Sequence, residues 1–506
     1  MYFCFHFYFQ FLNISTVFRL ASTLKVFHRL PEGVSVPRPA VGLLLRSEAE
    51  EVHSRALELL SKVGVYFEDK SVEKVMVDGG CELKGGRVLI PEELVKEALS
   101  KAPRRFELYD RDGGYVATLG DGALLFNPGS AAVRILDYGA AEPRPPTLGD
   151  LKRFVILADA LEHIGAQSTA LVPKDVPVEV SDAERLYAVL KYSRKPVVTG
   201  AFTVENLPLM VEMLAAVRED YRDRPFAIFD VCPSPPLSWS AITSRNLVDL
   251  ARLGVPAEII SMPGLGANAP LTVYGALIQH HAEVLSGVVL AQLVSPGAKV
   301  VYGGSPTLVH PRHGTALIAA PEAALVSLAY RDMARLVELP AHTYMAISDA
   351  KVPDFQAGAE AGFTAALAAL AAFDVVSGPG MLEFESTQSM EKLVLDNEVC
   401  GIARRLARGF SISPGDFDVI REVVLSKKGN FLAHRHTLAN LRREVHLPRV
   451  WDAEPVARRN LLERAHGEVE RLLKEHEPPE LEGDRLEALD KVRTELWRRV
   501  GAAPPV

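Results

Sequence analysis

Ala341-His342-Thr343-Tyr344-Met345-Ala346, followed by Ile347-Ser348-Asp349-Ala350-Lys351-Val352-Pro353-Asp354, is the stretch that decides the fold of this 506-residue chain. The first six residues have the pattern of a short buried strand, and the segment from Gly358 to Phe373 has the length and composition of a helix. Loops that connect a strand to a helix often hold active sites. The stretch therefore predicts one strand-to-helix unit with a candidate site in its loop.

The same unit recurs between Gly122 and Glu383, where eight short apolar runs alternate with helix-length segments. Parallel strands that are buried on both faces read as continuous apolar runs of this kind. The predicted strands are Ala123 to Phe126, Ile164 to Ser168, Pro196 to Thr199, Phe226 to Val231, Ala257 to Ser261, Lys299 to Tyr302, Ala341 to Ala346 and Val375 to Ser377.

Eight such units predict an α/β fold of the (β/α)₈ TIM-barrel type, because a closed ring leaves no strand edge unpaired. An open, doubly wound sheet is the alternative. That fold usually places a Gly-rich phosphate loop after its first strand, and residues 127–130 read Asn-Pro-Gly-Ser instead. The barrel is the favoured prediction.

The flanking regions give the predicted domain organisation. Residues 41–118 form a small N-terminal α/β region, residues 119–385 the barrel, and residues 386–506 a mostly helical C-terminal region. Residues 1–40 are an extension in which phenylalanines alternate from Phe3 to Phe11. The apolar run in this extension is too short to span a bilayer, which takes about 20 apolar residues. We interpret the extension either as the result of a start codon assigned too early or as a disordered segment.

Composition excludes several classes of partner. The chain is 48% hydrophobic and 24% charged, with a formal charge of -8, so it lacks the positive field that binds nucleic acid. The four cysteines are far apart and lack Cys-x-x-Cys spacing. This pattern predicts a cytoplasmic protein with no structural metal and no membrane segment. The long apolar helix from Val273 to Val294 predicts a homo-oligomer.

Active sites of such barrels lie where the strands end, so residues there are the candidate substrate contacts. Small, aromatic and oxygen-bearing side chains dominate this set, which favours a cationic or neutral organic guest held by ring faces and lone pairs. For any single ring, packing in the core is an equally good interpretation. The candidates are Phe126, Asn127, Gln167, Asp230, Tyr302, Ser305 and Tyr344.

Other candidates have weaker patterns. His280 and Glu283 share one helix face and could relay protons or bind a metal, although anchoring of the helix is the better interpretation because no third ligand is evident. His310 and Arg312 could meet a substrate carboxylate, or they are solvated loop residues. Cys232 is best read as a buried, inert thiol.

Several blocks of sequence, in one order, resemble the trimethylamine:corrinoid methyltransferase superfamily. They include Cys232 to Pro235, residues 282–287, the Ser348 to Asp354 loop and Gly380 to Glu383. The likeness runs from about Leu45 to the C-terminus. Well-known members of this superfamily carry pyrrolysine immediately before the Ser-Asp-Ala-Lys run, where this chain has Ile347.

The resemblance implies a (β/α)₈ barrel that moves a methyl group from an amine to the Co(I) corrinoid of a separate protein, with no cofactor bound by this chain. Members without pyrrolysine resemble quaternary-amine enzymes such as glycine betaine methyltransferase, so Ile347, Asp349 and Glu383 are the candidate catalytic positions. Three alternatives remain: a trimethylamine-type enzyme without pyrrolysine, a lyase or aldolase that uses Lys351 as an amine nucleophile, and a non-catalytic amine-binding protein.

Overall fold

The computed structural model describes residues 36–426, 429–452, 460–481 and 483–505. Most of the N-terminal extension, with its alternating phenylalanines, lies outside the described residues. The chain divides into two compact units, of which the larger comprises Arg38–Arg408 and Leu441–Val506 and the smaller includes Gly409–Asn440. The predicted domain boundaries after residues 118 and 385 both fall inside the larger unit and stay predictions.

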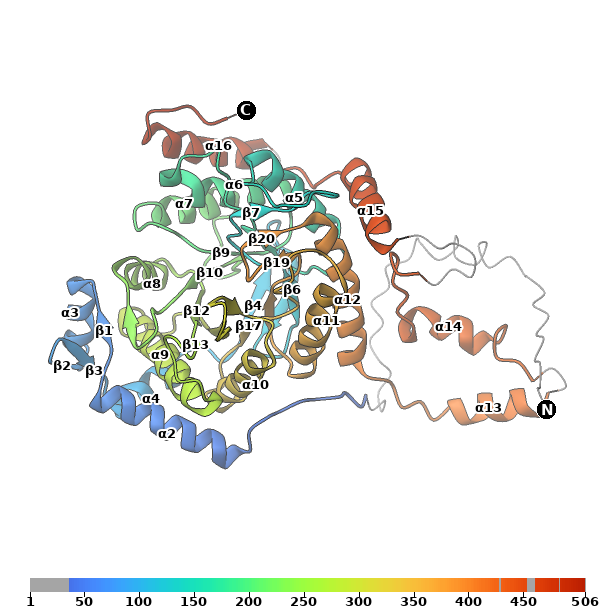
Figure 1. Ribbon diagram of the computed structural model, residues 1–506, viewed down its shortest axis with the longest axis horizontal. Helices are drawn as coiled ribbons and strands as arrows, with labels where there is room; N and C mark the ends of the chain where they lie inside the picture. Colours follow the sequence, from blue (N-terminus) through green and yellow to red (C-terminus); the bar gives the residue numbers. More distant parts are fainter. Residues whose placement is uncertain (1–35, 427–428, 453–459, 482, 506) are drawn as a thin grey trace. The chain divides into compact units, whose positions relative to one another are not determined.

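Each of the eight predicted runs contains or adjoins a strand, and these strands form two parallel sheets (Figure 1). The larger sheet contains, in spatial order, β14 (Val300–Gly304), β12 (Ala257–Ser261), β10 (Ala227–Val231), β9 (Val197–Thr199) and β8 (Gln167–Ser168). The smaller sheet contains β17 (His342–Tyr344), β18 (Val375–Ser377) and β6 (Leu125–Asn127).

Backbone contacts join the edges of these two sheets. Tyr302 in β14 forms an isolated parallel bridge with Ala341, next to β17. At the other edge, the carbonyl oxygen of Phe126 in β6 accepts hydrogen bonds from the N–H groups of Gly165 and Ala166, at 2.8 and 3.2 Å, just before β8. The fold is therefore of the mixed α/β type with parallel sheets.

Each of these strands is followed along the chain by a helix, and Figure 1 shows these helices surrounding the strands. The helices are α5 (Leu148–Ala160), α6 (Ser181–Tyr192), α7 (Leu207–Val217), α8 (Ala241–Leu253), α9 (Val273–Val294), α10 (Pro321–Leu336), α11 (Phe355–Leu370) and α12 (Met390–Arg408). Local sequence sets their ends. The carboxylate of Asp354 accepts a hydrogen bond from Ala357 N at 3.1 Å and so caps α11, while α8 stops at Gly254, whose φ of 72° suits glycine.

Helix α9 is long and apolar enough to cross a membrane by length and composition, but 83% of its apolar window is buried inside the protein. It packs against α2 (Arg46–Lys62), α4 (Glu92–Lys101), α8 and α10 of the same chain. An interior helix is apolar all round for this reason. The apolarity of α9 thus reflects packing within one chain and gives no support to self-association.

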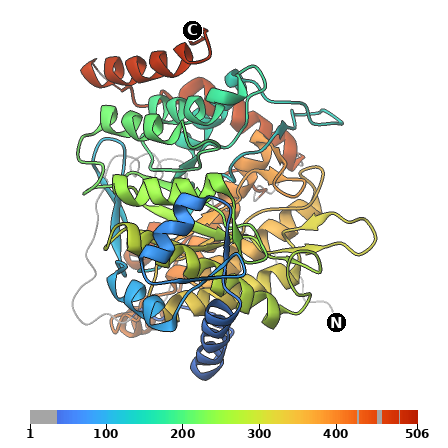
Figure 2. The ribbon, with the colours of Figure 1, turned by 90° about the vertical axis from the view of Figure 1, so that its left-hand side faces the viewer.

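The N-terminal region packs on the outer side of the larger sheet's helices, as Figure 2 shows in blue. Besides α2 and α4 it contains β1 (Tyr66–Phe67), α3 (Lys70–Asp78), β2 (Glu82–Lys84) and β3 (Arg87–Leu89). Strand β1 pairs in parallel with β11 (Ser238–Trp239), which follows β10. The predicted N-terminal α/β region thus contains both helices and strands.

A hairpin covers the amino ends of the parallel strands. Strands β4 (Phe106–Tyr109) and β5 (Tyr115–Leu119) pair in antiparallel fashion around a turn at Gly113 and Gly114. Their apolar side chains form a separate cluster with one residue from each of five parallel strands. The cluster contains Phe106, Leu108, Leu119, Leu125, Val198, Ile228, Val301 and Val375.

Short strands and further helices complete the chain. The strands lie in the loops after the parallel strands: β7 (Arg134–Ile135), β13 (Gly264–Leu265), β15 (Thr307–Val309), β16 (Ala316–Leu317), β19 (Met381–Leu382) and β20 (Thr387–Gln388). The helices are α13 (Asp416–Leu425), α14 (Arg435–Glu444), α15 (Leu461–Glu475) and α16 (Gly483–Arg498), so the predicted helical character of the C-terminal region is present.

Candidate functional site

Side-chain alternation decides which strand residues can meet at a common site. Leu125, Ile228 and Val301 belong to the inner cluster that the hairpin covers. Successive side chains of a strand point to opposite faces, so residues two positions further on share the inner face and lie nearer the carboxyl end. This places Asn127, Asp230 and Gly303 on the inner face, together with Ser377.

Two carboxyl groups lie side by side where the carboxyl end of β10 pairs with the first residues of β12. Asp230 is the register partner of Glu258, and Glu258 is fully buried. The Oδ1 atom of Asp230 and both carboxyl oxygens of Glu258 lack a hydrogen-bond partner among the described residues. Burial raises the pKa of Asp230 to about 7, and burial together with the charge of Asp230 raises the pKa of Glu258 well above its usual range.

A third carboxyl group, that of Glu385, comes from the turn between β19 and β20. Ser305, after β14, donates a hydrogen bond to its Oε1 at 3.3 Å. Burial raises the pKa of Glu385 to about 8, and the nearby charges of Asp349 and Asp230 act in the same direction. The three carboxyl groups of Asp230, Glu258 and Glu385, which we call the acidic cluster, thus resist ionisation unless a cation is supplied.

The turn that carries Glu385 is strained. Glu383, Phe384 and Glu385 have φ values of 50°, 57° and 67°, a conformation that costs a non-glycine residue about 1 to 3 kcal/mol. The Lys351 ammonium lies 3.8 Å from the centroid of the Phe384 ring and 3.8 Å from Glu383 Oε1. The Glu383 N–H also donates to the carbonyl of Ala350 at 3.0 Å. The loop after β17 therefore holds this turn in place.

A hydrogen-bonded chain lies beside the acidic cluster. Ser377 Oγ donates to Asn127 Oδ1 at 3.0 Å and accepts from His342 Nε2 at 2.9 Å. Burial lowers the pKa of His342 to about 3, so the ring is neutral. Its Nε2 lies 3.7 Å from Glu258 Oε2, and its Nδ1 has no partner in the described part of the chain. With Nε2 as the donor, Nδ1 carries a lone pair.

One buried cation, Arg185, faces the acidic cluster from α6. Its Nη2 donates to the carbonyl of Thr169 and its guanidinium lies 4.9 Å from the centroid of Phe202. Burial lowers its pKa to about 10, and the charges of Asp182 and then Asp230 oppose this effect, so the guanidinium is charged at neutral pH. Its Nε and Nη1 have no hydrogen-bond partner among the residues described. Two directed donors are thus available to an anionic group.

Tyr344 and Cys232 border the same site. The Tyr344 hydroxyl lies 3.2 Å from Ser130 Oγ, and its ring packs edge-on against His342 with centroids 5.1 Å apart. Burial, with the charges of the acidic cluster, raises the pKa of the Cys232 thiol far above its usual value. Cys232 is therefore an inert thiol rather than a nucleophile.

Three predicted contacts point away from this site. The Phe126 ring lies under Arg404 of α12, the Gln167 Nε2 donates to Val155 of α5 at 2.9 Å, and the Tyr302 hydroxyl bonds His281 of α9 at 2.8 Å. Each of the three occupies the outer face of its strand. They were predicted because they lie near strand ends. Successive side chains of a strand point to opposite faces, and these three side chains point toward the surrounding helices.

The predicted catalytic positions differ in what they contact. Ile347 is fully buried and belongs to the hydrophobic core. Asp349 accepts hydrogen bonds from Ile318 N and Ala319 N at 3.1 and 3.0 Å, and burial raises its pKa to about 6. Glu383 accepts from Thr387 Oγ1 at 2.6 Å and pairs with Lys351, so the carboxylate that joins the acidic cluster is Glu385 instead.

The remaining candidates have structural contacts. His310 Nδ1 accepts hydrogen bonds from the N–H groups of Arg312 and His313 in an exposed turn between β15 and β16. His280 Nε2 lies 3.1 Å from the Gly303 carbonyl, and Glu283 accepts from Leu237 N and Ser261 Oγ. His280 and Glu283 thus tie α9 to the strands. Within the described residues, no group of three His, Cys, Asp or Glu side chains is placed to hold a metal ion.

Sequence reasoning missed four residues of the site. Glu258 and His342 interrupt apolar runs, and a polar residue within a buried strand is a signal that could have identified both. Glu385 lies two residues from the chosen Glu383, and only the strained turn distinguishes them. Arg185 gave no signal, because a buried arginine in a helix reads like an exposed one.

Fold and site together define an α/β enzyme whose buried ionisable groups gather against the parallel strands β10, β12 and β17. The family model described as trimethylamine methyltransferase (MTTB) matches residues 22–495, and the chain belongs to this family. The expected methyltransferase activity and the resemblance drawn from the loop motifs are thereby confirmed.

Similar proteins carry related names. The chain is 31% identical over 464 residues to trimethylamine methyltransferase MttB of Methanosarcina barkeri, covering 88% of this chain and 93% of that relative. It is 28% identical over 456 residues to glycine betaine methyltransferase of Desulfitobacterium hafniense strain Y51, covering 88% and 95%. A solved structure of the M. barkeri monomethylamine methyltransferase MtmB gives a TM-score of 0.47 at 14% identity, with 90% and 93% covered.

Proposed function

We propose that this enzyme transfers a methyl group from a zwitterionic quaternary amine resembling glycine betaine to the Co(I) corrinoid of a separate protein. The arrangement of charge carries the proposal. The fully buried Glu258 and the half-buried Asp230 and Glu385 lie together, and the charge of Asp230 acts on the buried Arg185 guanidinium, which has two free donors. A quaternary ammonium would satisfy the acidic cluster, and a carboxylate on the same molecule would satisfy Arg185.

The Tyr344 side chain suits the same guest. A quaternary ammonium has no N–H to donate, so a site for it relies on charge and on aromatic faces, each worth about 0.5 to 2 kcal/mol. Tyr344 is partly exposed beside Asp230 and Glu385, whose charges act on its hydroxyl. A quaternary ammonium group placed against this ring would also contact the carboxylates of Asp230 and Glu385.

Ile347 fits a quaternary rather than a tertiary amine. Its aliphatic side chain can form no adduct with an amine. In the proposed reaction the C–N bond of the quaternary amine breaks, its electron pair stays on nitrogen, and a tertiary amine leaves with an uncharged nitrogen and its carboxylate. Cobalt(I) supplies the electron pair of the new Co–CH₃ bond and becomes Co(III). The chain's own residues bind, orient and exclude water.

We further propose that the eight parallel strands close into one (β/α)₈ barrel. The Tyr302–Ala341 bridge and the hydrogen bonds of the Phe126 carbonyl support closure at the two junctions between the sheets. The open mouth at the carboxyl ends would then receive the corrinoid-binding partner. We also propose that the chain binds no corrinoid of its own. The same proposal includes a cytoplasmic location and a homo-oligomeric state.

The alternative that uses Lys351 as a nucleophile is not favoured by its surroundings. A Schiff-base lysine needs a desolvated or electropositive environment that weakens its charge. The Lys351 side chain is 57% exposed and contacts Glu383 and the Phe384 ring, so it is neither desolvated nor surrounded by cations.

A methyl-transfer assay tests the function. The purified protein is mixed with Co(I) corrinoid and, in separate reactions, glycine betaine, choline, tetramethylammonium and trimethylamine, and methyl-Co(III) is followed by its absorbance. We expect product from glycine betaine and little from trimethylamine. Transfer from trimethylamine alone would overturn the proposal, and betaine binding without transfer to any corrinoid would favour a non-catalytic binding protein.

A further inference from the structure

A polar cavity of about 330 Å³ lies away from the acidic cluster, near the amino ends of β6 and β8. Its walls come from the segment after α5, from the last turns of α12, from the end of α14 and from α15, all within the larger unit. Arg404 lies at the inner end of the cavity, where its Nη2 donates a hydrogen bond to the carbonyl of Leu124, just before β6, at 2.9 Å. The volume suits a small metabolite.

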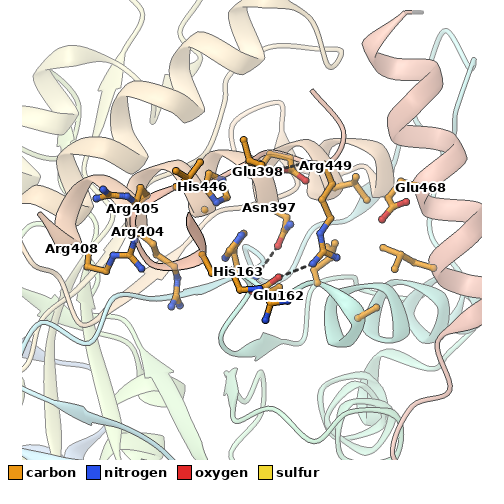
Figure 3. A pocket seen from close by; sticks show the side chains of 18 residues that line it. Glu162, His163, Asn397, Glu398, Arg404, Arg405, Arg408, His446, Arg449 and Glu468 are labelled. Carbon is orange, nitrogen blue, oxygen red and sulfur yellow. Dashed lines mark hydrogen bonds and ion pairs between the residues drawn. The ribbon is translucent and has the colours of Figure 1, made fainter. Parts of the chain in front are cut away.

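Arginines gather at one end of this cavity. Figure 3 shows Arg404, Arg405 and Arg408 close together, whereas Glu468 and Arg449 lie toward the other end. Arg405 is neutralised by Glu444, at 3.4 Å. In the part of the chain that the structure describes, Arg404, Arg408 and Arg442 form no ion pair with a carboxylate, and Arg404 Nε has no hydrogen-bond partner.

The carboxylates of the cavity are already engaged. Glu162 pairs with Arg449 at 3.1 Å, Glu468 pairs with Arg471 at 2.6 Å, and Glu398 accepts the backbone N–H of Arg449 at 3.0 Å. Glu162 also acts electrostatically on Arg404, but none of these three acids forms an ion pair with Arg404, Arg408 or Arg442 among the described residues. Burial, followed by the neighbouring Arg405, lowers the pKa of Arg408, as expected where like charges are crowded.

Two histidines line the wall between the two ends. The rings of His163 and His446 pack edge-on with centroids 5.2 Å apart, over Gly401, where an added Cβ would lie 2.5 Å from each. Burial lowers the pKa of His163 to about 4 and also lowers that of His446. Both rings are neutral at pH 7, and His446 Nε2 has no partner among described residues. They add a polar, uncharged surface.

The last turn of α12 accounts for only part of this arrangement. Cations at a helix C-terminus interact favourably with its dipole, which explains Arg405 and Arg408. Arg442 lies in the last turn of α14 and is explained in the same way, but neither dipole explains the open volume around which the two helix ends meet. Unpaired guanidinium groups from two elements around a cavity are the usual setting of an anion site.

We propose that this cavity binds a phosphate group, either free or carried by a small organic molecule. Phosphate offers three strong acceptor oxygens and a charge near -2, so it can engage several guanidinium groups at once, whereas one arginine satisfies a carboxylate. The volume exceeds that of a phosphate ion, and the neutral histidine wall leaves room for an organic part. The cavity is separate from the acidic cluster, so the inference does not depend on the proposed substrate.

Isothermal titration calorimetry on the full-length protein tests the inference. Inorganic phosphate and ribose 5-phosphate are titrated at matched ionic strength, with sodium chloride as the blank. We expect saturable binding with a Kd below about 1 mM. The double variant Arg408→Gln with Arg442→Gln should bind at least about tenfold more weakly, because it removes two unpaired cations.

A matched double variant, Arg46→Gln with Arg498→Gln, removes the same charge at exposed positions and should bind as the wild type does. Tighter binding of the ester would support an organic phosphate as the occupant, and equal binding would support the free ion. An unchanged Kd in the first double variant, or no saturable heat from either compound up to about 10 mM, would overturn the inference. Circular dichroism verifies that both variants are folded.

Discussion

Burial places the titration of Asp230 and Glu385 near neutral pH, with pKa values of about 7 and about 8. A quaternary ammonium binds the ionised forms, so its affinity should rise roughly tenfold between pH 6.5 and pH 8.5. Titration calorimetry with tetramethylammonium at several pH values measures this. Glu385→Gln should flatten the profile, and an affinity that falls with rising pH would contradict the assigned charges.

The same pKa shifts determine whether the stability of the ligand-free protein rises or falls with pH. The pKa values of Asp230 and Glu385 are higher in the folded protein than in the unfolded chain, so the folded state binds more protons above about pH 4. The stabilising contribution of protonation is present at low pH and is lost as the pH rises through 7 to 8. Glu385→Gln should weaken this dependence in urea unfolding curves.

Lys351 acts, in this account, as a cation that holds the turn of Glu385. Lys351→Arg keeps a cation over the Phe384 ring and beside Glu383, so methyl transfer should fall by no more than about threefold. A Schiff-base mechanism would lose all activity, because a guanidinium does not condense with a carbonyl group. Initial rates of methyl-Co(III) formation distinguish the two mechanisms. Lys351→Met is the comparison variant, because it removes the cation that holds the turn of Glu385.

At the scale of elements, α9 depends on buried hydrogen bonds. Glu283 accepts from Leu237 N, Ser261 Oγ and Gln279 Nε2 at 2.8, 2.6 and 3.0 Å. Glu283→Ala leaves buried donors unsatisfied and should lower the free energy of unfolding by about 2 to 4 kcal/mol. Urea denaturation measures the change. Glu51→Ala on exposed α2 is the control, and equal effects of both variants would contradict the anchoring role.

Elements were predictable from sequence where burial imposed a pattern. The apolar runs at Ala257 to Ser261 and Val375 to Ser377 coincide with β12 and β18 because both faces of these strands are covered. Two-residue strands such as β19 and β20 have no such pattern. They form because long-range contacts position them, and they determine which glutamate of the 383–385 turn faces inward.

For the whole molecule, the alternation of strands and helices predicted an α/β fold, and the loop motifs predicted the family. The fine structure of the site was less accessible. Asp230 and Tyr344 were found because they lie near the ends of their strands on the inner face, whereas Phe126 and Tyr302 lie on the outer face of theirs. Arg185 comes from α6, and only the folded chain brings it to the acidic cluster.

Self-association remains a prediction without the support first drawn from α9, since that helix is covered by its own chain. Sedimentation velocity over a range of protein concentrations measures the state directly. A homo-oligomer should persist at low micromolar concentration, and a single species with the 55.2 kDa mass of one chain would show the prediction to be wrong.

The central claim is that one site holds both charges of a betaine, and titration calorimetry of glycine betaine and tetramethylammonium tests it most directly. Wild-type protein should bind glycine betaine at least about tenfold more tightly than tetramethylammonium, because Arg185 has two free donors for the carboxylate. Arg185→Met should abolish that preference while it retains tetramethylammonium binding, which also shows that the variant is folded. A preference for glycine betaine that survives in Arg185→Met, or a wild-type protein that binds trimethylamine but neither quaternary amine, would contradict the account.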